Sequence, residues 1–156
     1  MKASVRAIAA AALAVAASSG FAADNLTLNV TANVAAVCNL TLSGPMAFGT
    51  LDPTSTADAT ASVTASYKCT KGTVVSSFTV NGGISGSYGG TMTGASTGPD
   101  SIGYTIEWTN PTAYTGLGLG AVTAKTVTLS GTVPNANFVN VKPDSYAGSV
   151  GIAVNY

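Results

Sequence analysis

The stretch of residues 25–42, NLTLNVTANVAAVCNLTL, carries an apolar residue at every even position. Asparagine or threonine fills most of the odd positions. Successive side chains of a β-strand point to opposite faces, so this period of two is typical of a strand with one buried face. The pattern therefore predicts one strand over residues 26–42.

This expected strand is longer than the domain that would contain it. At about 3.3 Å per residue, a straight strand of this length spans about 53 Å. A compact domain of this size has a radius of gyration near 14 Å and a diameter of about 36 Å. Two interpretations remain open, because the strand could bulge and cross between two sheets, or its first half could be donated to a neighbouring molecule.

The apolar face of the first half would contribute a large free energy if it were buried. Inserting its four larger apolar side chains, at about 1.5–3 kcal/mol each, gives about 6–12 kcal/mol. These side chains are Leu26, Leu28, Val30 and Val34. An ordinary domain has a total stability of about 5–15 kcal/mol. A domain that lacks such a strand would be barely stable, and one that receives it would be hard to unfold.

The other end of the sequence, SVGIAVNY over residues 149–156, also alternates. It places Val150, Ile152, Val154 and Tyr156 on one face, and we expect it to form a last strand with an unpaired edge. Such an edge is an aggregation hazard unless something covers it. A free donor strand and an uncovered edge together predict a head-to-tail interface, which builds an open filament.

The first residues have the layout of a secretory signal peptide. Charged residues at the start are followed by the alanine-rich run of residues 7–17 and by small residues up to Ala23. A membrane anchor is less favoured, because a spanning helix needs about 20 apolar residues. Cleavage after Ala22 suits the small-residue rule better than cleavage after Ala23. We expect a signal peptide over residues 1–22, an N-terminal extension over 23–34 and one domain over 35–156.

Composition excludes several classes of protein. Beyond residue 22 the chain keeps four lysines against six acidic residues, a net charge of −2, so nucleic acid is not an expected partner. Charged residues make up 8% of the chain, and glycine, serine, threonine, alanine and valine dominate it.

No helical periodicity appears beyond residue 24, which indicates an all-β domain, a sandwich rather than a barrel. The expected strands cover residues 26–42, 46–48, 59–69, 73–80, 102–108, 122–133 and 149–156. Residues 82–98 hold many glycines and are expected to be hairpin loops.

The two cysteines are expected to form a structural disulfide. Cys38 and Cys69 lie in an exported chain, and such a pair closes in an oxidising compartment. The chain has no histidine, so neither a metal site nor another cofactor is expected. Because the bond would join the first strand to the next long one, we expect it to link the two sheets of the sandwich.

Catalysis is not expected. A hydrolytic triad needs a base, and without histidine only a few lysines and carboxylates remain. Asp52 and Asp58 could act as paired carboxylates, but turn chemistry favours solvated turn residues. Tyr104, Trp108 and Tyr114 could stack on a sugar. However, Tyr104 and Trp108 share strand parity with neighbouring isoleucines, which favours a position in the core.

Three stretches resemble the spore coat protein U domain, which is found in pilins of the archaic (Csu-type) chaperone-usher pathway. VAAVCNLTLSGPMAFGTLDP (34–53) is similar to the family's opening, a cysteine followed by FG-x-x-D-P, and YKCTKG (67–72) to its second cysteine segment. GTVPNANFVNVKPDSYAGSVGIAVNY (131–156) is similar to the closing stretch. Asp144 and Gly148 depart from the family, which commonly has glycine just before the Ser-Tyr pair and aspartate two residues after the tyrosine.

The resemblance implies an incomplete immunoglobulin-like sandwich, completed by an N-terminal donor strand from a neighbouring subunit. A periplasmic chaperone and an outer-membrane usher would assemble identical or related subunits into an extracellular fimbria for adhesion and biofilm formation. The implied donor residues are Leu26, Leu28, Val30, Ala32 and Val34. The acceptor groove would run beside Val150–Tyr156 and the strand around Cys38. The alternative is a secreted coat or carbohydrate-binding module that folds alone.

Overall fold

The computed structural model describes residues 25–156 except 85, 97 and 98. The expected signal peptide lies outside the described residues. The chain divides into two units after Asn33. The described residues of the first unit, 25–33, form no strand.

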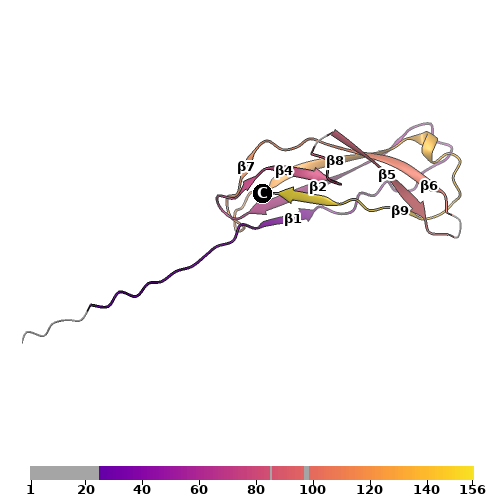
Figure 1. Cartoon of the computed structure of the whole chain (residues 1–156). Coiled ribbons are helices and arrows are strands. Elements are labelled where there is room, and N and C mark those ends of the chain that lie inside the picture. Colours follow the sequence, from indigo (N-terminus) through magenta and orange to yellow (C-terminus); the bar gives the residue numbers. More distant parts are fainter. Residues whose placement is uncertain (1–24, 85, 97–98) are drawn as a thin grey trace, which may run out of the picture. The chain divides into compact units, whose positions relative to one another are not determined.

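The second unit, Val34–Tyr156, is built on a six-stranded antiparallel sheet with the order β1-β2-β8-β6-β5-β9 (Figure 1). These strands are β1 (Cys38–Leu42), β2 (Ala59–Cys69), β5 (Gly86–Gly94), β6 (Ser101–Trp108), β8 (Lys125–Val133) and β9 (Tyr146–Ala147). The long strand β2 pairs along its whole length, with Ala59 opposite Val133 of β8 and Cys69 opposite Cys38 of β1. Strands far apart in the sequence therefore share one continuous layer.

Two short sheets form the other layer. One pairs β4 (Ser77–Val80) with β10 (Ile152–Asn155), and the other pairs β3 (Val74–Val75) with β7 (Tyr114–Thr115). Among the described residues the only helical turn is the 3₁₀ turn η1 (Asn135–Asn137). The fold is thus all-β, as expected, and has the form of an immunoglobulin-like sandwich that lacks a strand.

Alternation along the strands places the core between the layers. In β6 the even residues Ile102, Tyr104, Ile106 and Trp108 are buried, while the odd residues are exposed or half-buried. The same alternation in β2 and β8 buries Val63, Ala65, Tyr67, Cys69, Val127, Leu129 and Val133. Phe78 and Val80 of β4 cover these side chains from the opposite layer. The prediction that Tyr104 and Trp108 belong to the core is confirmed.

Several strand predictions need correction. The strand expected over residues 26–42 begins only at Cys38, because its partner β2 ends at Cys69. The strand expected over residues 46–48 is absent, since this segment has no ladder partner. The glycine-rich region expected to be loops contains β5, in which Tyr88 and Met92 are half-buried between exposed residues. Small residues on the outward face do not prevent this strand, because β6 pairs with it along residues 86–93 and β9 pairs with it at Thr93 and Gly94.

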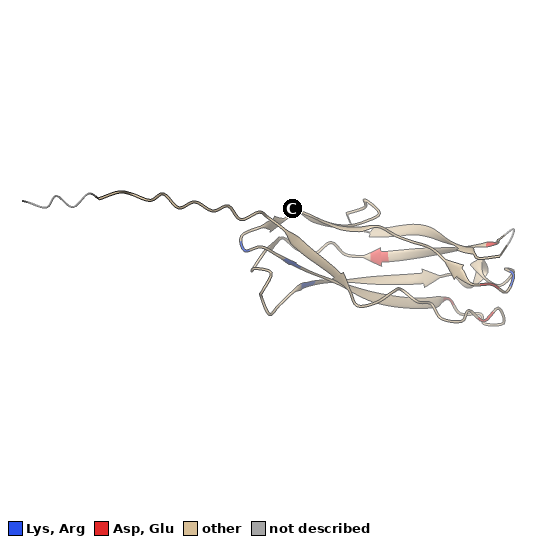
Figure 2. Ribbon diagram, turned by 90° about the horizontal axis from the view of Figure 1, so that it is seen from below, with Lys and Arg blue, Asp and Glu red and all other residues tan. Residues whose placement is uncertain are grey.

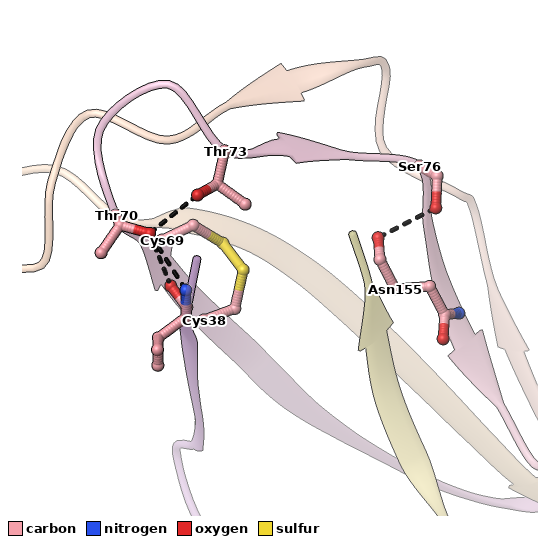
Figure 3. The surroundings of a disulfide bond; sticks show 7 residues. Cys38, Cys69, Thr70, Thr73, Ser76 and Asn155 are labelled. Carbon is pink, nitrogen blue, oxygen red and sulfur yellow. Dashed lines mark hydrogen bonds between the residues drawn. A yellow bond between two sulfur atoms is a disulfide. The ribbon is translucent and has the colours of Figure 1, made fainter. Parts of the chain in front are cut away.

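The disulfide joins Cys38 to Cys69, which confirms the predicted pairing. The bond lies within one sheet, between directly opposite residues of β1 and β2, whereas the sequence led us to expect a link across the two sheets. Beyond it, the N–H of Val37 donates to Oγ1 of Thr70 at 3.0 Å, and Thr70 Oγ1 lies 2.7 Å from Thr73 Oγ1 (Figure 3). Covalent and hydrogen bonds together therefore fix the start of β1 against the end of β2.

Candidate functional site

Core side chains line an open space beside β1 and β10. A mostly apolar cavity of about 1090 Å³ opens there. Its floor is made of core side chains from β2, β4, β6 and β8, together with Phe138: Val63, Val80, Ile102, Tyr104, Ile106, Leu129 and Phe138. Folded interiors are close-packed and hold few voids larger than a water molecule. A cavity of this size on the core indicates that a piece of the fold is missing.

Two strand edges border the cavity. β1 pairs only with β2, and β10 pairs only with β4, among the residues that the structure describes. The two strands lie side by side without a shared ladder (Figure 1). Leu42 at the end of β1 and Ile152 at the start of β10 both line the cavity. A strand added to either free edge would therefore cover it.

The chain between β1 and β2 forms one wall. Met46 and Phe48 are half-buried in this segment and pack against the core. They lie over Gly131 of β8, where a Cβ atom would meet Met46 and would come within 2.8 Å of Cζ of Phe48. Glycine at this position lets the segment approach the sheet without joining it. Together with Leu51, these side chains define the groove on the β1 side.

The segment that leads into β10 forms the opposite wall. Asp144 accepts hydrogen bonds from N–H and Oγ of Ser96 at 2.9 and 2.8 Å, and the backbone bond is the larger cause of its lowered pKa. Asp100 accepts a hydrogen bond from the N–H of Lys142 at 2.8 Å. The hydroxyl of Tyr146 donates to the carbonyl of Lys142 at 2.7 Å. Turn carboxylates thus hold this wall against the turn between β5 and β6.

The residues predicted for the acceptor groove lie on this wall and on β10. Val150, Ile152 and Val154 are half-buried and pack against the core, and the first two line the cavity. Tyr156 follows the strand and is 56% exposed. Ile152 and Val154 therefore make the inward face of β10, and Val150 is half-buried just before the strand.

The residues predicted as donors have exposed apolar side chains. Leu26, Leu28 and Val30 are 94%, 84% and 83% exposed, and Ala32 is exposed as well. Val34, the first residue of the second unit, is 83% exposed. Apolar side chains of this size are seldom left so open in a row.

The other candidate residues take structural roles. Asp52 accepts two hydrogen bonds from Thr54, of which the side-chain bond is the larger cause of the lowered pKa of Asp52. Asp58 accepts a hydrogen bond from the N–H of Asn135 at 2.8 Å. Asp52 begins a turn, and Asp58 lies in the loop just before β2. Tyr114 meets Tyr67 edge-on, with ring centroids 5.4 Å apart, and is half-buried like a core residue. With Tyr104 and Trp108 buried, these aromatic rings offer no sugar platform.

The walls of the groove were not predicted from the sequence. Residues 44–51 and 141–149 line it, although only the strand edges beside them were expected to do so. A signal was present in the first wall, where Met46, Phe48 and Leu51 are apolar in a segment bounded by prolines. Such a segment cannot easily join a ladder, yet it needs an apolar surface to cover.

Among the described residues, no cluster of histidine, cysteine, aspartate or glutamate side chains is placed to hold a metal ion. Across the same part of the chain, no helix has the length and apolar character required to cross a bilayer.

Comparison with known proteins identifies the family. The model of the Spore Coat Protein U domain matches residues 24–153. Searches of curated proteins and of solved structures found no match. Spore Coat Protein U domains are structural domains of chaperone-usher pilus subunits and of coat proteins, which are exported to the surface or the coat. Because the match covers most of its length, the chain belongs to the Spore Coat Protein U domain family.

Proposed function

We propose that this protein is a structural pilus subunit that polymerises by donor-strand exchange. The N-terminal extension of one copy fills the apolar groove of the next, with Leu26, Leu28, Val30, Ala32 and Val34 directed into the groove. The strand pairs with the free edge of β10 on one side and of β1 on the other. Each subunit then both donates and receives a strand.

The observation that carries this proposal is the open apolar cavity over the core. It is floored by side chains of the hydrophobic core, and it is bordered by two strand edges. The same chain carries an alternating apolar segment with side chains more than 80% exposed. Burying the four larger donor side chains would supply about 6–12 kcal/mol, as much as many whole domains possess.

A subunit whose groove is empty would be barely stable, so it would need assembly partners during export. A periplasmic chaperone would lend a strand during export, and an outer-membrane usher would exchange that strand for the extension of the next subunit. A subunit that supplies both a groove and a donor segment fits the shaft of the fibre, where each copy binds a neighbour on either side. The fibre would serve attachment and biofilm formation at the cell surface.

The test changes the apolar face of the extension while the full chain is still exported. Leu28→Asp/Val30→Asp places two charges on the face that enters the groove, where a buried unpaired charge is strongly unfavourable. Thr27→Asp/Thr31→Asp adds the same charges to the opposite face and serves as the matched control. We expect the first variant to give monomers and no fibres by electron microscopy. The control should give fibres and ladders that resist sodium dodecyl sulfate in unheated gels.

Fibres of wild-type appearance from Leu28→Asp/Val30→Asp would contradict the proposal. The alternative, a coat or carbohydrate-binding module that folds alone, makes a different prediction for the wild type. Such a module would elute as a stable monomer at every concentration, with no ladder in an unheated gel.

A further inference from the structure

Three of the four lysines in the described part of the chain lie at one end of the sandwich (Figure 2). Lys68 is the last residue but one of β2 and Lys125 begins the antiparallel neighbour β8, so the two residues share one end of the sheet. Lys71 lies in the turn that follows β2 and is exposed. We name this end, with Lys68, Lys71 and Lys125, the basic pole.

The opposite end carries most of the acidic residues (Figure 2). They are Asp52, Asp58, Asp100 and Asp144. Asp58 precedes β2 and is bonded to Asn135 just beyond β8, while Asp100 precedes β6. Lys142 lies at the same end, so this acidic pole has a net charge of −3. Glu107, the remaining described acid, lies on the outward face of β6.

The basic pole also has an apolar surface. Leu117 and Leu119 are 59% and 42% exposed in the loop that follows β7. The loop lies on the turn after β2, because Nζ of Lys68 donates to the carbonyl of Ala121 at 2.6 Å and the N–H of Gly72 donates to the carbonyl of Gly116 at 2.9 Å. Aliphatic side chains next to lysines resemble the composition of a protein interface, with an apolar centre and a polar rim.

The chain enters the domain at this same pole. The carbonyl of Val37 accepts a hydrogen bond from the N–H of Thr70 at 2.9 Å, in the turn that contains Lys71. Only residues 35–37 separate the end of the proposed donor segment from β1. Three residues span about 10 Å even when fully extended. A neighbour that holds residue 34 in its groove must therefore lie against, or very close to, the basic pole.

We propose that the basic pole of each subunit docks on the acidic pole of the next copy of this chain. This inference rests on the proposed function, since donor-strand exchange sets the distance between the copies. A separation of about 10 Å is close to one Debye length, which is about 10 Å at 0.1 M salt and about 8 Å at 0.15 M, so the poles still attract one another across the short linker. The contact makes the fibre stiff beyond what the inserted strand alone provides.

The charge distribution also selects the direction of the donor strand. β10 runs toward the basic pole and β1 runs away from it (Figure 1). A donor strand antiparallel to β10 ends at the neighbour's acidic pole and brings opposite charges together. A donor strand parallel to β10 ends at the neighbour's basic pole, where three lysines would face three lysines. Like charges placed together at an interface are unfavourable.

The first experiment cross-links wild-type fibres. A carbodiimide joins a lysine to a carboxylate in contact with it, and fibres mixed from isotope-labelled and unlabelled subunits separate links between copies from links within one copy. We expect links between copies from Lys71 or Lys125 to aspartates of the acidic pole. Their yield should fall as the salt is raised from 20 mM to 1 M during the reaction, because the Debye length shrinks to about 3 Å.

The second experiment compares variants. Lys71→Gln/Lys125→Gln removes two charges from the basic pole and keeps long side chains. Thr91→Glu/Thr128→Glu changes the net charge equally at exposed positions of β5 and β8. Wild-type fibres should have a longer persistence length in 20 mM salt than in 1 M salt, because the contact between the poles stiffens them. We expect fibres of the glutamine variant in 20 mM salt to have the same persistence length as wild-type fibres in 1 M salt. The glutamate control should keep the wild-type stiffness.

Failures of the two proposals are distinguishable in the same preparation. Fibres that resist detergent but show no links between the poles, or that keep their stiffness in the glutamine variant, overturn the docking alone. Absence of detergent-resistant ladders overturns donor-strand exchange and the docking with it. If links are absent and the subunit instead sediments with phosphatidylglycerol vesicles in a Lys71- and Lys125-dependent manner, the basic pole serves a lipid surface and the docking is wrong.

Discussion

The bond between Cys38 and Cys69 joins the first residue of β1 to the last residue of β2, where the chain enters the domain. The cysteines are 31 residues apart in sequence, and the chain-entropy relation for a loop of this length gives about 3–4 kcal/mol. We expect Cys38→Ala/Cys69→Ala to lower the free energy of unfolding by this amount in urea denaturation. Reduced wild type should match the variant. Equal stability of the variant and of the oxidised wild type would contradict the prediction.

Asp144 connects the groove wall to the turn between β5 and β6. Its carboxylate makes the free energy of unfolding depend on pH. Its pKa is lowered below 3.8, first by the N–H of Ser96, then by the hydroxyl of Ser96 and the N–H of Ser145. A carboxylate with a depressed folded-state pKa stabilises the fold at pH above its unfolded value, and this contribution disappears as the pH falls through the folded pKa. Asp144→Ala should therefore be less stable than wild type at pH 7.

The measurement is the urea midpoint of Asp144→Ala and wild type between pH 7 and pH 2. The difference should be constant down to about pH 5, narrow below pH 3.8 and vanish once the carboxyl of the wild type is protonated. Glu107→Ala removes one carboxylate from the exposed face of β6 and controls for net charge. A difference between Asp144→Ala and wild type that persists at pH 2 would mean that the carboxylate is not its source.

At the scale of elements, Gly131 of β8 leaves room for the side chains of the groove wall that pack on the sheet. A Cβ atom at this buried position of β8 would meet the Met46 side chain and approach Cζ of Phe48 to 2.8 Å, so Gly131→Ala forces these two side chains to shift. Overpacking of this kind costs about 1–3 kcal/mol. Gly89→Ala, in β5, meets nothing within 4 Å and is the matched control. Urea denaturation should show a lower midpoint for Gly131→Ala only, and equal midpoints for both variants would contradict this account of the wall.

Within the domain of residues 35–156, strands with strict alternation were predictable, and elements that depend on distant partners were not. The bounds of β2 at Ala59 and Cys69 agree with the sequence pattern, because alternating apolar and polar residues indicate a half-buried strand directly. β5 was missed, since its glycines and hydroxyl residues suggest a loop until β6 and β9 supply partners. Met46 and Phe48 were wrongly predicted as a strand, because burial against a sheet produces the same apolar spacing as pairing with it.

Across the whole molecule, the unusual length of the alternating N-terminal stretch anticipated an incomplete sandwich. A strand of that length does not fit inside one compact domain, and the structure keeps only Cys38–Leu42 of it as β1. The position of the cavity could not be derived in the same way. Its floor combines Val80, Leu129 and Phe138, which are far apart in the sequence and meet only through the order of strands in the sheet.

A peptide with the sequence of residues 25–34 tests the incomplete sandwich without genetic change to the subunit. A ligand that binds only the folded state stabilises it by about 2.7 kcal/mol at one hundred times its dissociation constant. For a domain of this length, about 4 °C of melting temperature corresponds to each kcal/mol, so the shift should be about 10 °C. The added peptide should also occupy free grooves and shorten the fibres. The same peptide with Leu28→Asp and Val30→Asp should do neither. Equal effects of both peptides, or no effect of either, would mean that the cavity does not receive this segment.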